Sequence, residues 1–253
     1  MGRIIAIVNQ KGGVGKTTTA VNLTAALTER GRRVLLCDFD PQANATSGLG
    51  VDKRKTGKTI YDSLINGADP NSAIQQTKFG WLLPSDSALA GAGVELIGAR
   101  DREHQLRRVL QPLAEKFDYI LIDCPPSLEL LTLNGLCVAD GILIPVQCEY
   151  YALEGLSDLM ATLRAVKRRV NPGLEIFGVV LTMYDGRTNF SAQVAQEVRR
   201  HFPGKVFTTM IPRNVRLAEA PSHGLPATAY DRTSRGAQAY GQLADEICQK
   251  GAW

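Results

Sequence analysis

A run of glycines followed by lysine and threonine lies near the start of the chain, in the stretch NQKGGVGKTTTA at residues 9–20. Glycines leave the backbone free to turn its N–H groups toward an anion, and here they are Gly12, Gly13 and Gly15. Lys16 and Thr17 provide the G-K-[ST] ending of a phosphate-binding loop, where the lysine reaches the β- and γ-phosphates and the hydroxyl holds Mg²⁺. Thr18, one position further, is placed to contact the α-phosphate. These residues predict the binding of a nucleoside triphosphate with Mg²⁺.

The first half of this loop departs from the usual G-x-x-x-x-G-K-[ST] pattern, because Gln10 occupies the position of the first glycine and Lys11 follows it. A lysine there is not needed for the nucleotide of its own chain, since Lys16 already reaches the terminal phosphates. Lys11 is therefore either an ordinary surface lysine or a cation that points toward a triphosphate on a facing subunit. In the second case it would neutralise charge that develops on the transferred γ-phosphoryl group, as an arginine finger does.

Acidic residues end two of the expected strands, where a site for Mg²⁺ and nucleotide requires them. Asp123 closes the apolar run DYILID, and we expect it to hold Mg²⁺ directly or through water. Asp38 and Asp40 end a second apolar run as D-F-D-P, and strand alternation sends both side chains to the same side. The alternatives are a turn or helix cap for Asp123 and a polar turn before Pro41 for the pair.

The elements that must position these residues alternate between apolar strands and helical patterns, which predicts an α/β fold. Expected strands cover residues 3–8, 33–38, 79–83, 118–123, 141–146, 176–183 and 205–211. Expected helices cover a segment from Thr17 to a stop at Gly31, then 102–116, 153–170, 189–202 and 235–249, with a polar loop at 41–58. We predict a doubly wound, mostly parallel sheet with helices on both faces, formed by residues 1–253 as a single domain.

The composition is typical of a globular protein, with 44% hydrophobic and 21% charged residues. No apolar run reaches the roughly 18 residues of a membrane span, and no signal-peptide pattern is present, so we expect a cytoplasmic protein. The five cysteines are far apart, which favours buried thiols over a disulfide framework or zinc site. The net charge of +4 falls within residues 151–253, where 13 Lys and Arg face 9 Asp and Glu. Such an excess suits either a polyanion or a solvated basic face.

The stretch KGGVGKT resembles the deviant Walker A motif of the ParA/MinD group of P-loop NTPases, and the wider chain resembles the ParA/Soj-type partitioning ATPases. The matching stretches are NQKGGVGKTT, DFDPQANATSGLG, DYILIDCPPSL, PVQCEYYALEGL and IPRNVRLAEAPSHG, spread over residues 9–224. In this family the additional lysine, here Lys11, crosses the interface of an ATP-sandwich dimer. The resemblance implies that the chain binds ATP and Mg²⁺, forms an ATP-dependent homodimer, and hydrolyses ATP with Lys11, Lys16 and Asp40.

The resemblance also implies roles that the phosphate loop alone does not settle. Asp40 would orient the attacking water, and Asp38 would support the Mg²⁺ region. Residues 41–50 and 124–127 would act as switch I and switch II, and Ala43 stands where the family commonly has glycine. The residues implied to bind ATP are Lys11, Gly12, Gly13, Val14, Gly15, Lys16, Thr17 and Thr18, with Met183, Met210, Ile211 and Pro212 near the adenine base.

Basic residues in the later loops suggest how a phosphate backbone would be contacted. Arg187 and Arg216 match positions that contact DNA in the Soj-type family. Other cations in this part of the chain are Arg164, Lys167, Arg168, Arg169, Arg199, Arg200, Arg213 and Arg235. Neither aromatic interleaving for single strands nor a recognition helix is present, so we expect sequence-independent binding to double-stranded DNA. The alternative for each arginine is a solvated side chain or a surface ion pair.

Three related functions remain as alternatives. A MinD-type membrane-cycling ATPase would need an amphipathic C-terminal helix, whereas Tyr240, Leu243 and Ile247 form a narrow stripe typical of a core-facing helix. A metallocluster reductase would need a second cysteine ligand to join Cys124, and a P-loop kinase would need an acceptor pocket and a lid. By resemblance, we expect a nucleoid-associated protein that does not bind membranes and has a ParB-like centromere-binding partner.

Overall fold

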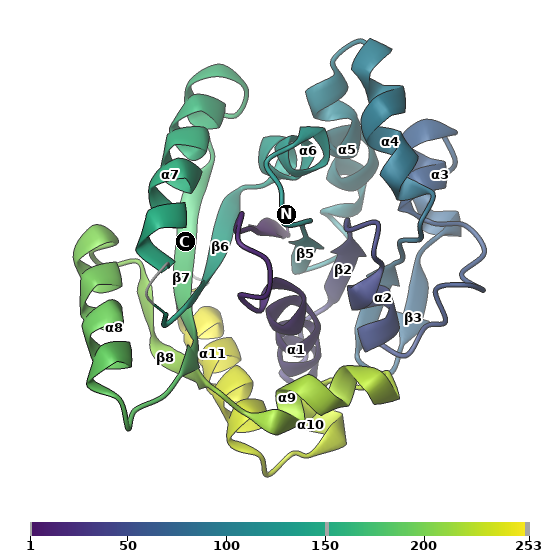
Figure 1. The fold of residues 1–253 in the computed structure, drawn as a ribbon. Coiled ribbons are helices and arrows are strands. Elements are labelled where there is room, and N and C mark those ends of the chain that lie inside the picture. Colours follow the sequence, from purple (N-terminus) through teal and green to yellow (C-terminus); the bar gives the residue numbers. More distant parts are fainter. Residues whose placement is uncertain (1, 150–151, 251–253) are drawn as a thin grey trace.

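The structure is a computed structural model, and it describes residues 2–149 and 152–250 (Figure 1). The strands are β1 (Arg3–Ile7), β2 (Val34–Asp38), β3 (Gln75–Thr77), β4 (Gly80–Leu83), β5 (Tyr119–Asp123), β6 (Gly141–Gln147), β7 (Glu175–Tyr184) and β8 (Val206–Pro212). They form one sheet in the order β3-β4-β2-β5-β1-β6-β7-β8. All neighbouring pairs are parallel except β3 with β4. The prediction of a mostly parallel sheet is confirmed.

Helices cover both faces of this sheet. They are α1 (Lys16–Glu29), α2 (Asn44–Gly48), α3 (Ile60–Ile65), α4 (Leu89–Glu95), α5 (Gln105–Leu110), α6 (Leu130–Val138), α7 (Ala152–Arg169), α8 (Asn189–His201), α9 (Val215–Glu219), α10 (Ala227–Tyr230) and α11 (Arg235–Lys250). Short 3₁₀ turns lie at Pro70–Ser72, Leu96–Gly98, Arg102–His104, Gln111–Leu113 and Ala220–His223.

The alternation of each strand divides the apolar side chains between two core layers. In β1, Ile4 and Ala6 join the layer that contains α3 to α8, whereas Ile5 and Ile7 join the layer beneath α1 and α11 (Figure 1). Side chains at alternate positions of a strand point to opposite faces, so a strand buried on both sides is apolar throughout. This accounts for the continuous apolar runs in the sequence and confirms the doubly wound fold.

The strand order places the glycine loop at a switch point of the sheet. β1 lies between β5 and β6, and the connections from β1 and β6 therefore leave on opposite sides. Ile7 pairs with Asp123, and Asp38 also pairs with Asp123, so the carboxyl ends of β1, β2 and β5 meet at one edge. In open α/β sheets, ligands bind in the crevice outside such strand ends.

Gly31 ends α1 as predicted, with a φ of 74° and its N–H donated to the carbonyl of Thr28. The expected helix at 102–116 is interrupted instead. It consists of α5 flanked by two 3₁₀ turns, and the second turn contains Pro112, which has no N–H to donate to a continuing helix. α6 was not predicted, because its sequence LLTLNGLCV is buried almost all around and shows no helical period.

The last helix, α11, packs into the core. Tyr240, Leu243 and Ile247 are fully buried, as the stripe predicts, and Asp245 pairs with Arg30. The carboxylate of Glu246 accepts the backbone N–H groups of Thr208 and Thr209 on β8. The apolar face of this helix is therefore already used within the protein.

Candidate nucleotide and magnesium site

The glycine loop between β1 and α1 adopts conformations that its glycines allow. Gly13 and Gly15 have φ angles of 74° and 91°, in the left-handed region that side chains disfavour. A Cβ added at Gly12 or Gly13 would meet no atom within 4 Å, so these residues border open space instead of packing against the protein. Backbone N–H groups in such a turn, followed by a helix N-terminus, form a site for phosphate oxygens.

Lys16 begins α1 and is nearly buried, with 7% of its surface exposed. Its Nζ donates a hydrogen bond to the backbone carbonyl of Lys11 at 3.0 Å. Burial lowers the pKa of the Lys16 amine, while the carboxyls of Asp123 and Asp40 act in the opposite direction. The amine is thus held inside the loop by a carbonyl that a phosphate oxygen can replace.

Two buried polar side chains that the sequence did not reveal anchor this loop to the sheet. Asn9 donates from Nδ2 to the carbonyl of Pro145 on β6 at 2.8 Å, and its Oδ1 accepts the N–H of Lys11 at 3.0 Å. The hydroxyl of Thr182 on β7 donates to the carbonyl of Val14 at 2.8 Å. A lone hydroxyl in the apolar run GVVLTM was the available signal for Thr182.

Asp123 ends β5 and is fully buried. Neither of its carboxylate oxygens has a hydrogen-bond partner among the described residues. Burial raises the pKa of this carboxyl well above its usual value, and the neighbouring carboxyl of Asp38 raises it further. The Thr17 hydroxyl and the Lys16 amine, both nearby, act in the opposite direction. A buried carboxylate with two unused oxygens, close to a threonine hydroxyl, fits the oxygen ligands that Mg²⁺ requires.

Asp38 is also fully buried, but its oxygens are already engaged. Oδ2 accepts both the N–H and the hydroxyl of Thr46 at 2.7 Å, and Oδ1 accepts the N–H of Asp40 at 3.3 Å. Burial raises the pKa of the Asp38 carboxyl to about 6, although the hydrogen bonds from Thr46 oppose this shift. The structure therefore places Asp38 next to Asp123, where its hydrogen bonds organise residues 41–50. Its support of the Mg²⁺ region stays a prediction.

A hydrogen-bond network connects Asp38 to Asp40 through two residues that the sequence did not indicate. The Thr46 hydroxyl, which donates to Asp38, also accepts the N–H of Ser85 at 3.0 Å. The Ser85 hydroxyl donates to the backbone carbonyl of Asp40 at 2.9 Å, and Oδ1 of Asp40 accepts the N–H of Gln42. Thr46 and Ser85 are fully buried, so the backbone on both sides of Asp40 is held from within the protein.

The backbone conformation at Ala43 explains why glycine is common at this position in the family that the sequence resembles. It is fully buried and has φ 52° and ψ 39°, a left-handed conformation that is unfavourable for a residue with a Cβ. The expectation of a featureless loop at 41–58 is wrong, because α2 begins directly after Ala43. The N–H of Thr46, within this short helix, is the one that Asp38 accepts.

A cavity of about 210 Å³ opens beside the phosphate loop, and most of the residues predicted to contact adenine line it. Its lining includes Gly15, Thr18, Met183, Ile211 and Pro212 among the predicted residues, and Thr182, Arg213, Asn214, Leu217, Ala218 and Tyr240 among those not predicted. Met183 has a φ of 51°, so a residue with strained backbone borders this cavity.

The structure does not bring Met210 into this cavity. Its side chain packs with the opposite core layer, and its sulfur lies 3.8 Å from Nη2 of Arg199 on α8. Alternation along β8 separates the two side chains, because Ile211 packs in the core layer beneath α1 and α11, whereas Met210 packs against the other layer. The sequence prediction overlooked this alternation.

Arg187 and Arg216 lie beyond the carboxyl ends of β7 and β8. Both form ion pairs, Arg187 with Asp185 at 2.7 Å, and Arg216 with Glu219 at 2.8 Å and Asp231 at 3.2 Å. Their side chains are nevertheless 88% and 49% exposed. Surface pairs of this kind contribute about 0–1 kcal/mol, so phosphates could replace the carboxylates at small cost.

The described residues contain no cluster of three His, Cys, Asp or Glu side chains that could hold a metal. Cys37, Cys124, Cys137 and Cys148 are buried free thiols there, and Cys248 is partly exposed. Over residues 2–149 and 152–250, none of the helices combines the length and the apolar character needed to cross a bilayer.

Comparison with known proteins relates this site to one family. A family model described as "AAA domain" matches residues 2–176. The chain is 54% identical to the sporulation initiation inhibitor protein Soj of Bacillus subtilis (strain 168), over 99% of this chain and 100% of that protein. It is 51% identical to the chromosome partitioning protein ParA of Myxococcus xanthus, over 99% and 89% respectively.

Solved structures share the fold. Cobyrinic acid a,c-diamide synthase from Mycobacterium smegmatis, with bound ADP and magnesium, superposes with a TM-score of 0.86 at 40% identity, covering 98% of this chain and 95% of that one. The cell division ATPase MinD of Pyrococcus furiosus gives 0.81 at 35% identity, covering 99% and 100%. The fold alone is therefore common to several functions, but the full-length identity to Soj and ParA is higher. This chain belongs to the Soj/ParA family of chromosome-partitioning ATPases.

Proposed function

We propose that this protein is a Mg²⁺-dependent ATPase that dimerises on binding ATP, binds double-stranded DNA without sequence preference, and releases it after hydrolysis. The observation that carries the proposal is the position of Lys11. Its N–H donates to Asn9 and its carbonyl accepts Nζ of Lys16, so Lys11 lies directly beside the amine that would bind the terminal phosphates. A second lysine at this position supports a role in neutralising phosphate charge.

In the proposed mechanism the loop N–H groups and Lys16 bind the phosphates, while the base occupies the cavity between Met183 and Pro212. Thr17 and Asp123 would hold Mg²⁺, which neutralises phosphate charge when bound. Asp40 would orient the attacking water, and Lys11 would reach the triphosphate of the partner subunit.

Thr46 should position Asp40 within this mechanism. Thr46→Val removes the hydroxyl that connects Asp38 with Ser85, and we expect it to lower kcat about tenfold while KM for ATP changes less than about twofold. Thr46→Ser keeps the hydroxyl and should restore the rate. The measurement is steady-state hydrolysis of ATP, together with urea unfolding of each variant.

Thr24→Val provides the matched control for Thr46→Val. The Thr24 hydroxyl is buried and donates to the carbonyl of Ala20 at 2.7 Å, outside the site. Thr46→Val loses two buried hydrogen bonds and Thr24→Val loses one, each at a cost of about 1–3 kcal/mol in unfolding free energy. An equal loss of kcat in Thr24→Val would contradict the positioning role.

The cavity and the proposed DNA surface share one segment of chain, which supports control of DNA binding by nucleotide. Arg213, Asn214 and Leu217 line the cavity, and Arg216 lies among them on the exposed side of α9. A nucleotide that moves this segment would move Arg216 with it. Dimerisation would also place the arginines of two subunits along one duplex, and doubling the phosphate contacts steepens the dependence on salt.

Binding to an unrelated DNA duplex should therefore be strong with ATP and weak with ADP. A salt series with each nucleotide measures the slope of log K against log[salt], which changes by about −0.9 for each phosphate contact. Arg216→Ala should make the slope shallower by about 0.9 per subunit. Arg102→Ala is the matched control, because Arg102 also pairs with a neighbouring glutamate but lies before α5, away from this surface.

Equal affinity for the duplex with ATP and with ADP would refute nucleotide control. Binding of the ATP form to anionic liposomes, in place of DNA, would support the MinD-type function. By family membership we also propose that a ParB-like partner stimulates hydrolysis, which is measured as an increased rate when that partner and DNA are added together.

A further inference from the structure

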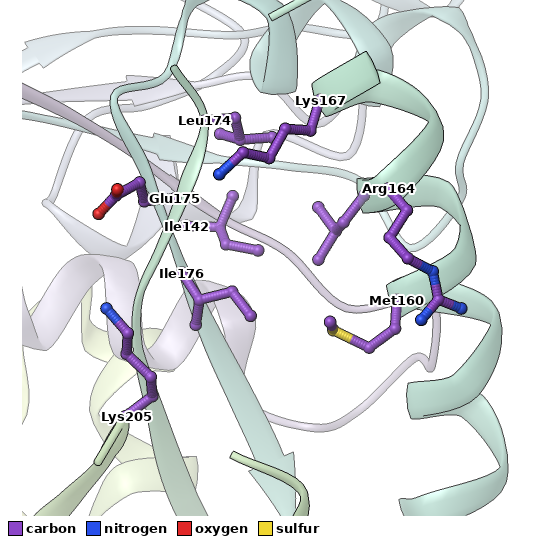
Figure 2. Close-up of a pocket in the computed structure, with 9 residues that line it drawn as sticks. Ile142, Met160, Arg164, Lys167, Leu174, Glu175, Ile176 and Lys205 are labelled. Carbon is purple, nitrogen blue, oxygen red and sulfur yellow. The ribbon is translucent and has the colours of Figure 1, made fainter. Parts of the chain in front are cut away.

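The amino ends of β6 and β7 border two adjoining hollows, at the opposite end of the sheet from the nucleotide site. The first, of about 280 Å³, lies between these strands and α7, and Ile142, Met160, Leu163, Leu174 and Ile176 form its apolar floor (Figure 2). The second, of about 330 Å³, lies on the α11 side of the same strand ends. The two share Glu175, Ile176 and Lys205, so they meet at the ends of these strands, and we call them together the amino-end groove.

Cations border this apolar floor. Figure 2 shows Arg164 and Lys167 on the helix side of the first hollow and Lys205 on the strand side, with the apolar side chains between them. Among the described residues, none of these three cations forms an ion pair or a side-chain hydrogen bond. Elsewhere on the surface, arginines such as Arg187 and Arg216 do find carboxylates. Glu175 lines both hollows, and Asp140, whose carboxylate accepts the N–H of Ile4, lines the second.

The groove is too far from the proposed DNA surface to belong to it. β7 runs for ten residues from Glu175 to Tyr184, which at about 3.3 Å per residue separates its ends by about 30 Å. Arg187 follows the carboxyl end of this strand, whereas the groove lies at its amino end. The cations of the groove are therefore not accounted for by the proposed function.

The lining favours a peptide over a nucleic acid or a nucleotide. The floor of the first hollow consists of aliphatic and thioether groups, and no glycine loop or aromatic platform lies among the described residues that line it. Its volume is at the lower limit of about 300 Å³ for pockets that enclose a whole small molecule, and suits a few apolar side chains. Met160, with its flexible side chain, can adapt to different occupants. The two adjoining hollows suit a segment of chain with carboxylates beside its apolar residues.

We propose that the amino-end groove binds an acidic peptide segment of a partner protein that carries leucine or isoleucine side chains. Those side chains would fill the hollows, and the carboxylates would pair with Lys167, Lys205 and Arg164. This site is separate from nucleotide binding and does not depend on the proposed DNA-binding cycle.

The test uses the full chain and the fluorescein-labelled peptide EELLEEILEE. Two reference peptides, EESSEESSEE and KKLLKKILKK, remove the apolar side chains or reverse the charge. Fluorescence anisotropy gives affinities, and methyl NMR of the four methionines gives the location. The Met160 methyl, assigned with Met160→Leu, should shift with the first peptide only, whereas Met183 should shift with ATP. The Met183 response reports nucleotide binding separately, so failure of one proposal is distinguishable from failure of the other.

Charge-reversal variants test whether the cations that border the groove bind the carboxylates of the peptide. Lys167→Glu and Lys205→Glu should each weaken binding of EELLEEILEE about tenfold. The double variant should instead accept KKLLKKILKK. Arg169→Glu is the matched control, because Arg169 is exposed in the last turn of α7 but does not line the groove.

Three results would overturn the proposal. Equal affinity for EELLEEILEE and EESSEESSEE would show that only charge is recognised. An equal loss of affinity for EELLEEILEE in Arg169→Glu and Lys167→Glu would show that binding does not depend on the cations that line the groove. A DNA duplex that shifts the Met160 methyl, with no shift from the peptide, would assign the groove to nucleic acid.

Discussion

Lys11→Ala is expected to bind ATP normally, yet to lose ATP-dependent dimerisation and to hydrolyse ATP about 10³-fold or more slowly when stimulated. The two hydrogen bonds that connect Lys11 to Lys16 and Asn9 are made by its backbone: its carbonyl accepts Nζ of Lys16, and its N–H donates to Asn9. Alanine retains both groups. Fluorescent-nucleotide titration, light scattering with a non-hydrolysable ATP analogue, and phosphate release measure binding, dimerisation and turnover in turn.

Lys16→Ala is the control for this experiment. Its amine is buried inside the loop, so its loss should abolish nucleotide binding itself, and dimerisation only as a consequence. Normal ATP-dependent dimers of Lys11→Ala would contradict the role across the interface. A loss of ATP affinity in Lys11→Ala as large as in Lys16→Ala would assign Lys11 to the nucleotide of its own subunit.

Asp123→Asn is expected to stabilise the protein without nucleotide and Mg²⁺, while lowering hydrolysis by about 10³-fold or more. The wild-type carboxylate is fully buried and has no hydrogen-bond partner among the described residues, so a neutral amide should raise the free energy of unfolding by about 1–3 kcal/mol. With Mg²⁺ and ATP, the variant should lose the further stabilisation that the wild type gains. Urea unfolding with and without Mg²⁺ and ATP measures both effects.

The difference in unfolding free energy between Asp123→Asn and the wild type is expected to increase with pH. Burial raises the pKa of the Asp123 carboxyl in the folded protein above its unfolded value of about 3.9. The wild type therefore loses stability as the pH rises from that value toward the folded pKa, while asparagine does not titrate. The advantage of Asp123→Asn should widen with pH.

Asp118→Asn is the control for the experiment on Asp123, since Asp118 lies just before β5 and Asp123 ends it. The Asp118 carboxylate accepts the backbone N–H of Arg33, which lowers its pKa, so its replacement should cost a little stability, less than about 1 kcal/mol. A decrease in stability for Asp123→Asn in the absence of Mg²⁺ would contradict the assignment of a metal-binding carboxylate.

The sequence predicted those parts of the fold and site whose residue types allow few alternatives. A glycine loop after a buried strand fixes the positions of Lys16 and Thr17, and strands buried on both faces must be apolar throughout, so the sheet was identified with few errors. Asp123 was singled out because an acid at the end of such a strand is conspicuous, and the structure places it there, fully buried. Its role in binding Mg²⁺ stays a prediction.

The network around Asp40 could not be predicted, because it depends on contacts between distant parts of the chain. Thr46 and Ser85 are 39 positions apart, and nothing in their local sequence distinguishes them from other hydroxyl residues. Met210 was expected near the base but does not line the cavity, and only the register of β8 decides which of its side chains face that side. Such features require the folded chain.

The two edges of the sheet offer little backbone to a further strand. At one edge the three polar residues of β3 run antiparallel to β4, and at the other Glu246 occupies the N–H groups of Thr208 and Thr209. Edge strands that are short or covered hinder pairing with a strand of another molecule. If copies of this protein line up along DNA, we expect them to associate through helices and loops, so that such arrays can come apart without the slow dissolution typical of stacked β-structure.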